Sequence, residues 1–367
     1  MIRMANQNWG VKKRILSVEP YRPGKPIDEV KRELGIREVV KLASNENPYG
    51  PSPLVLKAIQ AEAHQINRYP DGNCFYLRQA LAKQLQIKEE QIIFGNGSDE
   101  IIVMVLRAFV GEEDEVIVAK PSFLIYEIAA RLEGATVKAV PLRHFYYDLE
   151  KMAEAVAEKT KIIFIGNPDN PAGTYIPDQQ LKTFLNSVRR DILIVVDEAY
   201  FEYVIASDYP NTIKLLKTYP NLIVTRTFSK MYGLAGLRIG YGIARTQMID
   251  LLNRIRDPFN VNSIAQAAAL ACLKDRSYYR KIGLKIEEQR QFLYQRLAGM
   301  GLAFVQSVTN FILIDLKDQS TRIAQELLKR GVIVRDMKFW GLATFIRVTI
   351  GTEKENKKFI KALEELL

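Results

Sequence analysis

The sequence has very few of the residues that build disulfide frameworks and metal sites. Its 367 residues include two cysteines, Cys74 and Cys272, and two histidines, His64 and His144. The cysteines are far apart and form no Cys-x-x-Cys pair, and neither histidine has a metal-ligand partner nearby in the sequence. We therefore expect neither a disulfide framework nor a metal site.

A long apolar segment is also missing. The chain starts with MIRMANQNWGVKKRILSV, which is basic but lacks the apolar region of a signal peptide. The most apolar stretch, IIVMVLRAFV, is short and contains Arg107, whereas a membrane-spanning helix needs about 20 apolar residues. We therefore expect a cytoplasmic protein without a membrane partner.

The charge alone gives a weak argument for nucleic-acid binding. Lysine and arginine number 52, aspartate and glutamate 42, and the formal net charge is +10. Such an excess is compatible with a nucleic-acid partner, but the basic residues are scattered and the longest runs are pairs such as Arg189-Arg190. A basic surface that suits phosphorylated or carboxylated small molecules explains the charge better, so no nucleic-acid partner is expected.

Hydrophobic patterning predicts an α/β protein with more than one domain. Between residues 54 and 250, helical patterns alternate with the apolar runs DEVIVAK, KIIFIGN, ILIVVDEAY and NLIVTRTFSK. Short, nearly continuous apolar runs are typical of parallel strands that are buried on both faces. Beyond residue 250, a long helical pattern precedes the strand patterns NFILIDL, VIVRDM and FIRVTIG. We predict a proline-rich N-terminal arm (1–45) packing with the small domain, a large domain with a mostly parallel central sheet (46–255) and a smaller α/β domain (256–367).

Polar residues follow four predicted strands at the point where each strand ends, namely the short run QIIFG and the runs in KIIFIGN, ILIVVDEAY and NLIVTRTFSK. In open parallel sheets ligands bind beyond the carboxyl ends of the strands, so we expect these residues to surround one pocket. Each also has a plainer explanation, such as a helix N-cap, a turn residue, a structural ion pair or an exposed lysine. The residues are Ser98, Asn170, Asp197, Tyr200, Ser229 and Lys230.

Taken together, these groups match the needs of one cofactor. A buried lysine has a lowered pKa and can form a Schiff base with an aldehyde. A carboxylate that faces a pyridine nitrogen keeps that nitrogen protonated. Serine hydroxyls, amides at a helix start and an arginine bind phosphate. The combination predicts a site for pyridoxal 5′-phosphate.

The sequence resembles the histidinol-phosphate aminotransferase family, which belongs to the fold type I pyridoxal-phosphate enzymes. The resemblance covers nearly the whole chain, from EPYRPGKP near the start to IRVTIGT near the end. It rests on the segments KLASNENPYGPSP, RYPDG, GNGSDEII, NPDNPAGTY, VVDEAYFEY and RTFSKMYGLAGLRIGYG. The resemblance implies a large cofactor-binding domain, a smaller C-terminal domain and a homodimer.

The resemblance also implies roles for individual residues. Lys230 would be the Schiff-base lysine and would move a proton between the substrate Cα and the cofactor C4′, while Asp197 would pair with the pyridine nitrogen. Tyr200 and Asn170 would bond to the ring oxygen. Phe123 would stack on the cofactor ring. The cofactor phosphate would be held by Ser98, Asp99, Ser229 and Arg238, and also by Tyr69 from the partner subunit.

For the substrates, the resemblance implies that Arg347 binds the carboxylate of glutamate or 2-oxoglutarate. Arg335 and Tyr21 would hold the phosphate of histidinol phosphate, and Asn47 would also belong to the substrate site. A surface arginine and a packing tyrosine are the plainer explanations for Arg335 and Tyr21.

The implied reaction is amino transfer between glutamate and imidazole-acetol phosphate in histidine biosynthesis. An aromatic amino-acid aminotransferase, or an enzyme with both activities, is the alternative, and a decarboxylase of phosphorylated amino acids is a further one. The chain departs from the family pattern at Asp169 and Ala172, where asparagine and threonine are usual. Trp340 and Phe345 make the approach to Arg347 more aromatic, which puts the substrate range in question.

Overall fold

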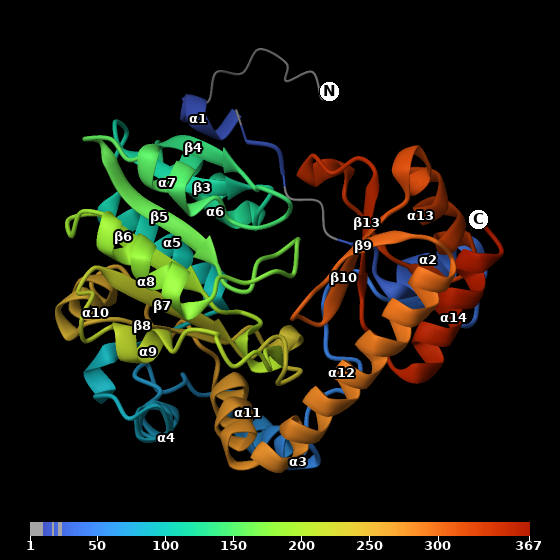
Figure 1. Cartoon of the computed structure of the whole chain (residues 1–367). Helices are drawn as coiled ribbons and strands as arrows, with labels where there is room; N and C mark the ends of the chain where they lie inside the picture. The colour runs from blue at the N-terminus through green and yellow to red at the C-terminus, as the bar shows by residue number, and fades with distance from the viewer. Residues whose placement is uncertain (1–9, 17, 21–23) are drawn as a thin grey trace.

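The computed structural model describes residues 10–16, 18–20 and 24–367 and shows an α/β protein with a large and a smaller part (Figure 1). The large part contains a seven-stranded sheet in the order β2-β8-β7-β6-β5-β3-β4. All neighbouring strands from β7 to β4 are parallel, and β8 alone runs antiparallel to its neighbours. The predicted mostly parallel sheet is confirmed. Its strands are β2 (Ile92–Gly95), β3 (Glu115–Lys120), β4 (Thr136–Pro141), β5 (Thr160–Gly166), β6 (Leu193–Asp197), β7 (Leu222–Thr227) and β8 (Gly240–Ile243).

Helices cover both faces of this sheet, which explains the uninterrupted apolar runs. Ile163 and Ile194 belong to one buried cluster, whereas their chain neighbours Phe164 and Val195 belong to the cluster on the other face. Full burial of each such side chain contributes about 1.5–3 kcal/mol. One face is covered by α5 (Ser98–Phe109), α6 (Leu124–Glu133) and α10 (Thr246–Asn253), and the other by α7 (Leu149–Glu154), α8 (Asp178–Ser187) and α9 (Thr212–Leu215).

The smaller part is built on a four-stranded antiparallel sheet in the order β12-β13-β10-β9. It lies beside the large sheet in Figure 1, with helices on its outer side. Its strands are β9 (Ala303–Val305), β10 (Phe311–Asp315), β12 (Arg335–Asp336) and β13 (Phe345–Thr349), and its helices are α12 (Arg276–Gly299), α13 (Ser320–Lys329) and α14 (Glu353–Glu364).

The single strand predicted for VIVRDM is divided between two sheets. Its first half, β11 (Val332–Ile333), pairs in parallel with β1 (Val40–Lys41), whereas its second half, β12, pairs with β13. The pattern of the segment cannot reveal this division, because the partners of each half come from distant parts of the chain.

The N-terminal segment contacts both parts of the molecule. Helix α1 (Lys13–Leu16) lies against α6, and Arg14 Nη1 is 2.5 Å from Glu112 Oε1. Helix α2 (Ile27–Leu34) instead buries Val30 in a cluster with Ile333 of the smaller part. The predicted domain boundaries at residues 45 and 255 stay predictions.

Three helices lie at the lower edge of Figure 1, near the start of α12. Helix α11 packs on both α3 and α4. Their bounds are α3 (Pro53–Glu62), α4 (Phe75–Leu85) and α11 (Ser263–Lys274). Within the described part of the chain, no helix is both long and apolar enough to cross a membrane.

Candidate active site

The carboxyl ends of β5, β6 and β7 border a cavity of about 200 Å³, where an open parallel sheet is expected to bind ligands. All residues predicted to bind the cofactor line this cavity, except Tyr69. Their roles stay predictions, but the chain brings them together. The lining residues are Ser98, Asp99, Phe123, Tyr126, Gly166, Pro168, Asn170, Asp197, Ala199, Tyr200, Thr227, Ser229, Lys230 and Arg238.

One corner of the cavity, where α5 begins, is suited to an anion. The N-cap of α5 is Gly97, which has a φ of 83° and no side chain to bond the first amides of the helix. Ser98 is the first helical residue, so its alternative explanation as the N-cap is wrong. Arg238 donates to Ser229 Oγ and to Asp99 Oδ2, both at 3.3 Å. Helix-start amides, a hydroxyl and a guanidinium together form a phosphate-binding corner.

Two glycines allow this corner to close tightly. A Cβ atom on Gly97 would lie 2.6 Å from Arg238 Nη2, and one on Gly240 would lie 2.5 Å from the amide nitrogen of Ser98. Gly240 has no room for a side chain, because the close atom belongs to the backbone. At Gly97 a side chain would push Arg238 aside, and the φ of 83° also favours glycine. Burial raises the pKa of the Asp99 carboxyl, and the adjacent Arg238 counteracts that shift.

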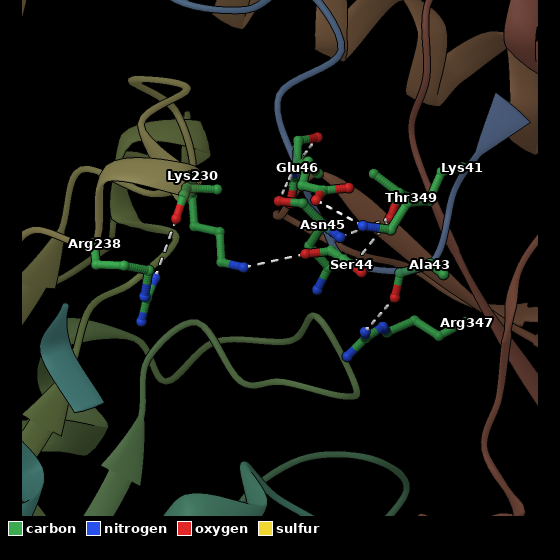
Figure 2. Close-up of polar contacts among 11 residues, drawn as sticks. Lys41, Ala43, Ser44, Asn45, Glu46, Lys230, Arg238, Arg347 and Thr349 are labelled. Atoms are coloured by element: carbon green, nitrogen blue, oxygen red, sulfur yellow. Dashed lines mark hydrogen bonds and ion pairs between the residues drawn. The ribbon is translucent and has the colours of Figure 1, made fainter. Parts of the chain in front are cut away.

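Lys230 follows β7 and extends toward the N-terminal segment (Figure 2). Its Nζ donates to the carbonyl oxygen of Ser44 at 3.3 Å and lies 5.6 Å from the centre of the Tyr200 ring. A hydrogen bond of this length holds the amine weakly. The amine therefore lines the cavity and is held there by one long hydrogen bond.

Asp197 ends β6 and is only 5% exposed. Its Oδ2 accepts a hydrogen bond from the Tyr126 hydroxyl at 2.8 Å, whereas its Oδ1 is buried and has no partner among the described residues. Burial raises the pKa of this carboxyl to about 6, against the opposing effect of the Tyr126 hydrogen bond. A buried acceptor without a donor is costly, so Oδ1 is suited to a ligand that brings an N–H group.

Tyr200 and Asn170 are held by residues from the smaller part of the molecule and from the N-terminal segment. The Tyr200 hydroxyl accepts a hydrogen bond from Asn45 Nδ2 at 2.9 Å. Asn45 is itself fixed by Thr349 of β13, whose Oγ1 accepts a hydrogen bond from the backbone amide of Asn45 at 2.9 Å (Figure 2). Arg347 Nη1 donates to Asn170 Oδ1. Both predicted partners of the ring oxygen are thus positioned across the gap between the two sheets.

Arg347 lies on β13, where it is 6% exposed. Its Nη2 donates to the carbonyl oxygen of Ala43 at 3.1 Å, and its guanidinium carbon is 5.3 Å from the centre of the Phe311 ring (Figure 2). Through Asn170 it reaches the wall of the cavity. Arg347 itself does not line the cavity, so its predicted role in binding a carboxylate stays a prediction.

Arg335 is the register partner of Arg347 in the antiparallel pair of β12 and β13. Its guanidinium lies 4.7 Å from the centre of the Trp340 ring and borders a different cavity, of about 580 Å³, together with Lys25 and Lys338. The structure therefore does not bring Arg335 into the cavity of Lys230. Tyr21, predicted to act with Arg335, lies outside the described residues.

The remaining predicted residues take different places. Phe123 lines the Lys230 cavity and also a neighbouring one of about 540 Å³ that Trp340 borders. Asn47 does not line the Lys230 cavity, and its Nδ2 donates to the carbonyl oxygen of Met231 at 2.7 Å. Tyr69 is 83% exposed and stacks on Phe259 with ring centres 4.8 Å apart, so within one chain it does not line the site.

Among the side chains that hydrogen-bond to predicted site residues, Tyr126 and Asn45 were not predicted from the sequence. Tyr126 lies on a helix face that is otherwise apolar, and its hydroxyl was the available signal, because a buried tyrosine needs a polar partner. Asn45 has a φ of 56°, unusual outside glycine, but nothing nearby in the sequence indicates its distant partners. In the described ranges, no group of three or more histidine, cysteine, aspartate or glutamate residues could hold a metal ion.

Comparison with known proteins gives a consistent result over the whole chain. The family model for aminotransferase class I and II matches residues 37–363. The chain is 48% identical over 354 residues to a histidinol-phosphate aminotransferase of Moorella thermoacetica, covering 96% of this chain and 92% of that protein. It is 45% identical over 357 residues to one of Anoxybacillus flavithermus, covering 97% and 96%.

A solved structure agrees with the sequence relatives. It is the histidinol-phosphate aminotransferase from Sinorhizobium meliloti in complex with pyridoxal-5′-phosphate. The two chains superpose with a TM-score of 0.91 at 29% identity, over 99% of this chain and 100% of the other.

Proposed function

Because the chain belongs to the aminotransferase class I and II family, and within it to the histidinol-phosphate aminotransferases, we propose that it transfers an amino group between histidinol phosphate and 2-oxoglutarate in histidine biosynthesis. The products of this transfer are imidazole-acetol phosphate and glutamate. The reaction proceeds as two successive half-reactions in ping-pong order. The observation that carries the proposal is the cavity that Lys230 and Asp197 share with an anion-binding corner.

We infer that pyridoxal 5′-phosphate is the cofactor. When bound, it supplies an electron sink that stabilises negative charge on the substrate Cα. The residues present fit this group, because Asp197 Oδ1 is a buried acceptor without a donor and the corner at α5 offers the donors that a phosphate needs. Asp197 would accept a hydrogen bond from the ring nitrogen, and Tyr200 and Asn170 would bond to the ring oxygen.

Lys230 is the proposed catalytic base. Its Nζ would take a proton from the substrate Cα and return it at the cofactor C4′, or the reverse. Its amine has one long hydrogen bond, to Ser44, and lies near the Tyr200 ring, so little holds it back from a ligand in the cavity.

Arg347 and Arg335 are proposed to bind the two substrates. Arg347 is held by Ala43 and Phe311 before any ligand arrives, so little entropy is lost when it binds the carboxylate of glutamate. Arg335 borders a cavity in which Lys25 and Lys338 add positive charge, which suits the phosphate of histidinol phosphate.

An aromatic amino-acid aminotransferase is the second candidate, alone or as an additional activity. The observation that favours it is the cavity of about 540 Å³ beside the cofactor site, because Phe123, Leu124, Phe339 and Trp340 contribute to its wall. Such a wall accepts an aromatic ring by burying apolar surface. It can accept the imidazole ring of histidinol phosphate as well.

A homodimer and a cytoplasmic location belong to the same proposal. Tyr69 is exposed and does not line the Lys230 cavity of its own chain, so its proposed role requires a second subunit. In this arrangement, Tyr69 of each chain would bond to the cofactor phosphate of the other chain.

The proposal is tested by measuring glutamate formation from histidinol phosphate and 2-oxoglutarate, beside the same assay with phenylalanine. A higher kcat/KM with histidinol phosphate supports the assignment to the histidine pathway. Comparable values mean an enzyme with both activities. Activity with phenylalanine alone moves the function to the second candidate. Release of carbon dioxide from an O-phosphorylated amino acid, which unlike histidinol phosphate has a carboxyl group, would identify a decarboxylase.

A further inference from the structure

Asp169 is a buried carboxyl group to which the proposed reaction gives no role. It is 1% exposed and lies in the turn that follows β5. Gly166, Pro168 and Asn170, which precede and follow it in the chain, line the Lys230 cavity. The carboxyl is therefore directly behind the wall of the active site.

Hydrogen-bond donors from two sides converge on this carboxyl group. The amide of Gly166 donates to the Tyr147 hydroxyl at 2.8 Å, and this hydroxyl donates to Asp169 Oδ1 at 3.2 Å. From the other side, the amide of Ala172 donates to Asp169 Oδ2 at 2.9 Å. Both carboxyl oxygens accept, so the contacts fit the ionised form.

The backbone of Asp169 closes the same turn. Its amide donates to the Thr174 carbonyl at 2.8 Å, and its carbonyl accepts from the Gly173 amide at 3.0 Å. The next residue, Asn170, presents its side chain to Arg347 and to the cavity. The shape of this turn therefore determines where the Asn170 amide lies.

We propose that Asp169 is a positioning residue, whose ionised carboxylate holds the turn in the shape that lets Asn170 bind the cofactor ring. The proposal rests on the proposed function of the site. Loss of the charge weakens the arrangement, because a protonated oxygen has to donate a hydrogen bond. The Tyr147 hydroxyl could accept from a protonated carboxyl only by giving up its own donation to Asp169, and Ala172 offers only a donor.

The charge of Asp169 changes in the neutral range. Burial raises the pKa of this carboxyl to about 7, although the hydrogen bonds from Ala172 and Tyr147 lower it. Cofactor binding should therefore strengthen as the pH rises through about 7. The other titratable groups around the turn and its contacts are Tyr147, Tyr126, Asp197, Tyr209 and Arg347.

The test measures the Kd of the purified apoprotein for pyridoxal 5′-phosphate between about pH 6 and pH 9, together with kcat/KM of the holoenzyme. Asp169→Asn carries a neutral side chain of the same shape, so it should bind with the weak, low-pH affinity of the wild type at every pH. The wild type should gain roughly fivefold in affinity across this range, which is the value of one net hydrogen bond.

Asp208→Asn is the matched control. Asp208 also accepts a tyrosine hydroxyl, from Tyr175 at 2.7 Å, but it lies outside the cavity. This variant should keep the pH dependence of the wild type. Tyr147→Phe is a second, independent variant that removes one donor to the carboxylate, so the inflection should move to higher pH. It decides the question if Asp169→Asn does not fold.

The proposal is overturned if Asp169→Asn keeps the affinity and the pH dependence of the wild type, or if Tyr147→Phe leaves the inflection in place. An Asp208→Asn variant that loses the inflection would overturn it as well. A wild-type protein that neither binds the cofactor nor forms glutamate contradicts the proposed function instead, so the two failures are distinguishable.

Discussion

Three acidic residues of this protein have buried carboxyl groups with raised pKa values. Burial raises the pKa of Asp197 to about 6, of Asp169 to about 7 and of Glu202 to about 8. Asp197 and Asp169 have hydrogen-bond donors, and Asp197 also has a proposed ligand. Glu202 differs, because both of its oxygens are buried and have no partner among the described residues.

Glu202→Gln should therefore stabilise the protein at alkaline pH. The raised pKa means that the folded chain binds a proton more tightly than the unfolded chain, whose value is near 4.5. The stability that this proton provides is complete below about pH 4.5 and is lost as the pH rises to about 8. The variant avoids that loss, which amounts to roughly 2–4 kcal/mol. Denaturant unfolding at about pH 5 and about pH 9 measures the difference.

Glu198→Gln is the matched control for this prediction. Glu198 is paired with Arg226 at 2.8 Å, and both side chains are buried. Removing its charge leaves Arg226 without its partner, so this variant should lose roughly 3–5 kcal/mol. The same sign of change in both variants would contradict the account of Glu202.

The ends of several strands form the candidate active site. Strand β2 leads through Gly97 into α5, β6 ends at Asp197, and β7 ends shortly before Lys230. Parallel strands bring their carboxyl ends to one edge, so residues far apart in sequence meet there. The short connection between β2 and α5 contains Gly97, which has a positive φ and lies against the Arg238 side chain.

Gly97→Ala should weaken cofactor binding by roughly tenfold, because the new Cβ would displace Arg238 from the phosphate corner. The φ of 83° adds backbone strain to this displacement. Gly35→Ala is the control, since Gly35 has a φ of 66° and no atom near its added Cβ. Titration with pyridoxal 5′-phosphate should show weakened binding in Gly97→Ala alone. Equal affinities in both variants would contradict this role for the corner.

The sequence predicted the elements that carry the site because their signal is local. Strands such as β5 and β6 are buried on both faces, so their apolar runs are continuous, and the polar residue after each run is easy to identify. Strand β8 was missed, because it is short and contains Gly240 and Gly242. The division between β11 and β12 was equally hidden, since it depends on which distant strand pairs with each half.

Long-range contacts of the site could not be predicted in the same way. Asn45 bonds to Tyr200 from 155 residues away, and Tyr126 looks like an ordinary core residue until its hydroxyl is seen at Asp197. Arg335 was predicted at the substrate phosphate through the family resemblance, and the structure leaves that role a proposal. A family pattern carries such contacts, but it does not show how the side chains of this chain are placed.

The whole molecule brings two parts together around the reacting groups. Lys230 and Asp197 come from the large part, whereas Arg347 comes from the smaller part and reaches Asn170 across the gap. Each part alone therefore lacks a component of the proposed site. The proposed role of the exposed Tyr69 would extend the same principle to a second chain.

Mixed dimers test the proposed role of Tyr69. A dimer of one Tyr69→Ala chain and one Lys230→Ala chain has one intact site if Tyr69 acts on the partner, so a random mixture should regain about one quarter of the wild-type activity. The control pairs Asp197→Asn with Lys230→Ala. Both changes affect the cavity of their own chain, so this mixture should stay inactive. A Tyr69 mixture that is equally inactive would place Tyr69 outside the partner's site.

The central claim, that Lys230 is the catalytic amine, is tested most directly by the turnover of Lys230→Ala. Glutamate formed per active site is measured over many cycles with histidinol phosphate and 2-oxoglutarate, beside Lys230→Arg, which keeps the charge but is a much weaker base. Both variants should lose more than about a thousandfold in kcat. Repeated turnover of Lys230→Ala at a rate near that of the wild type would contradict the account.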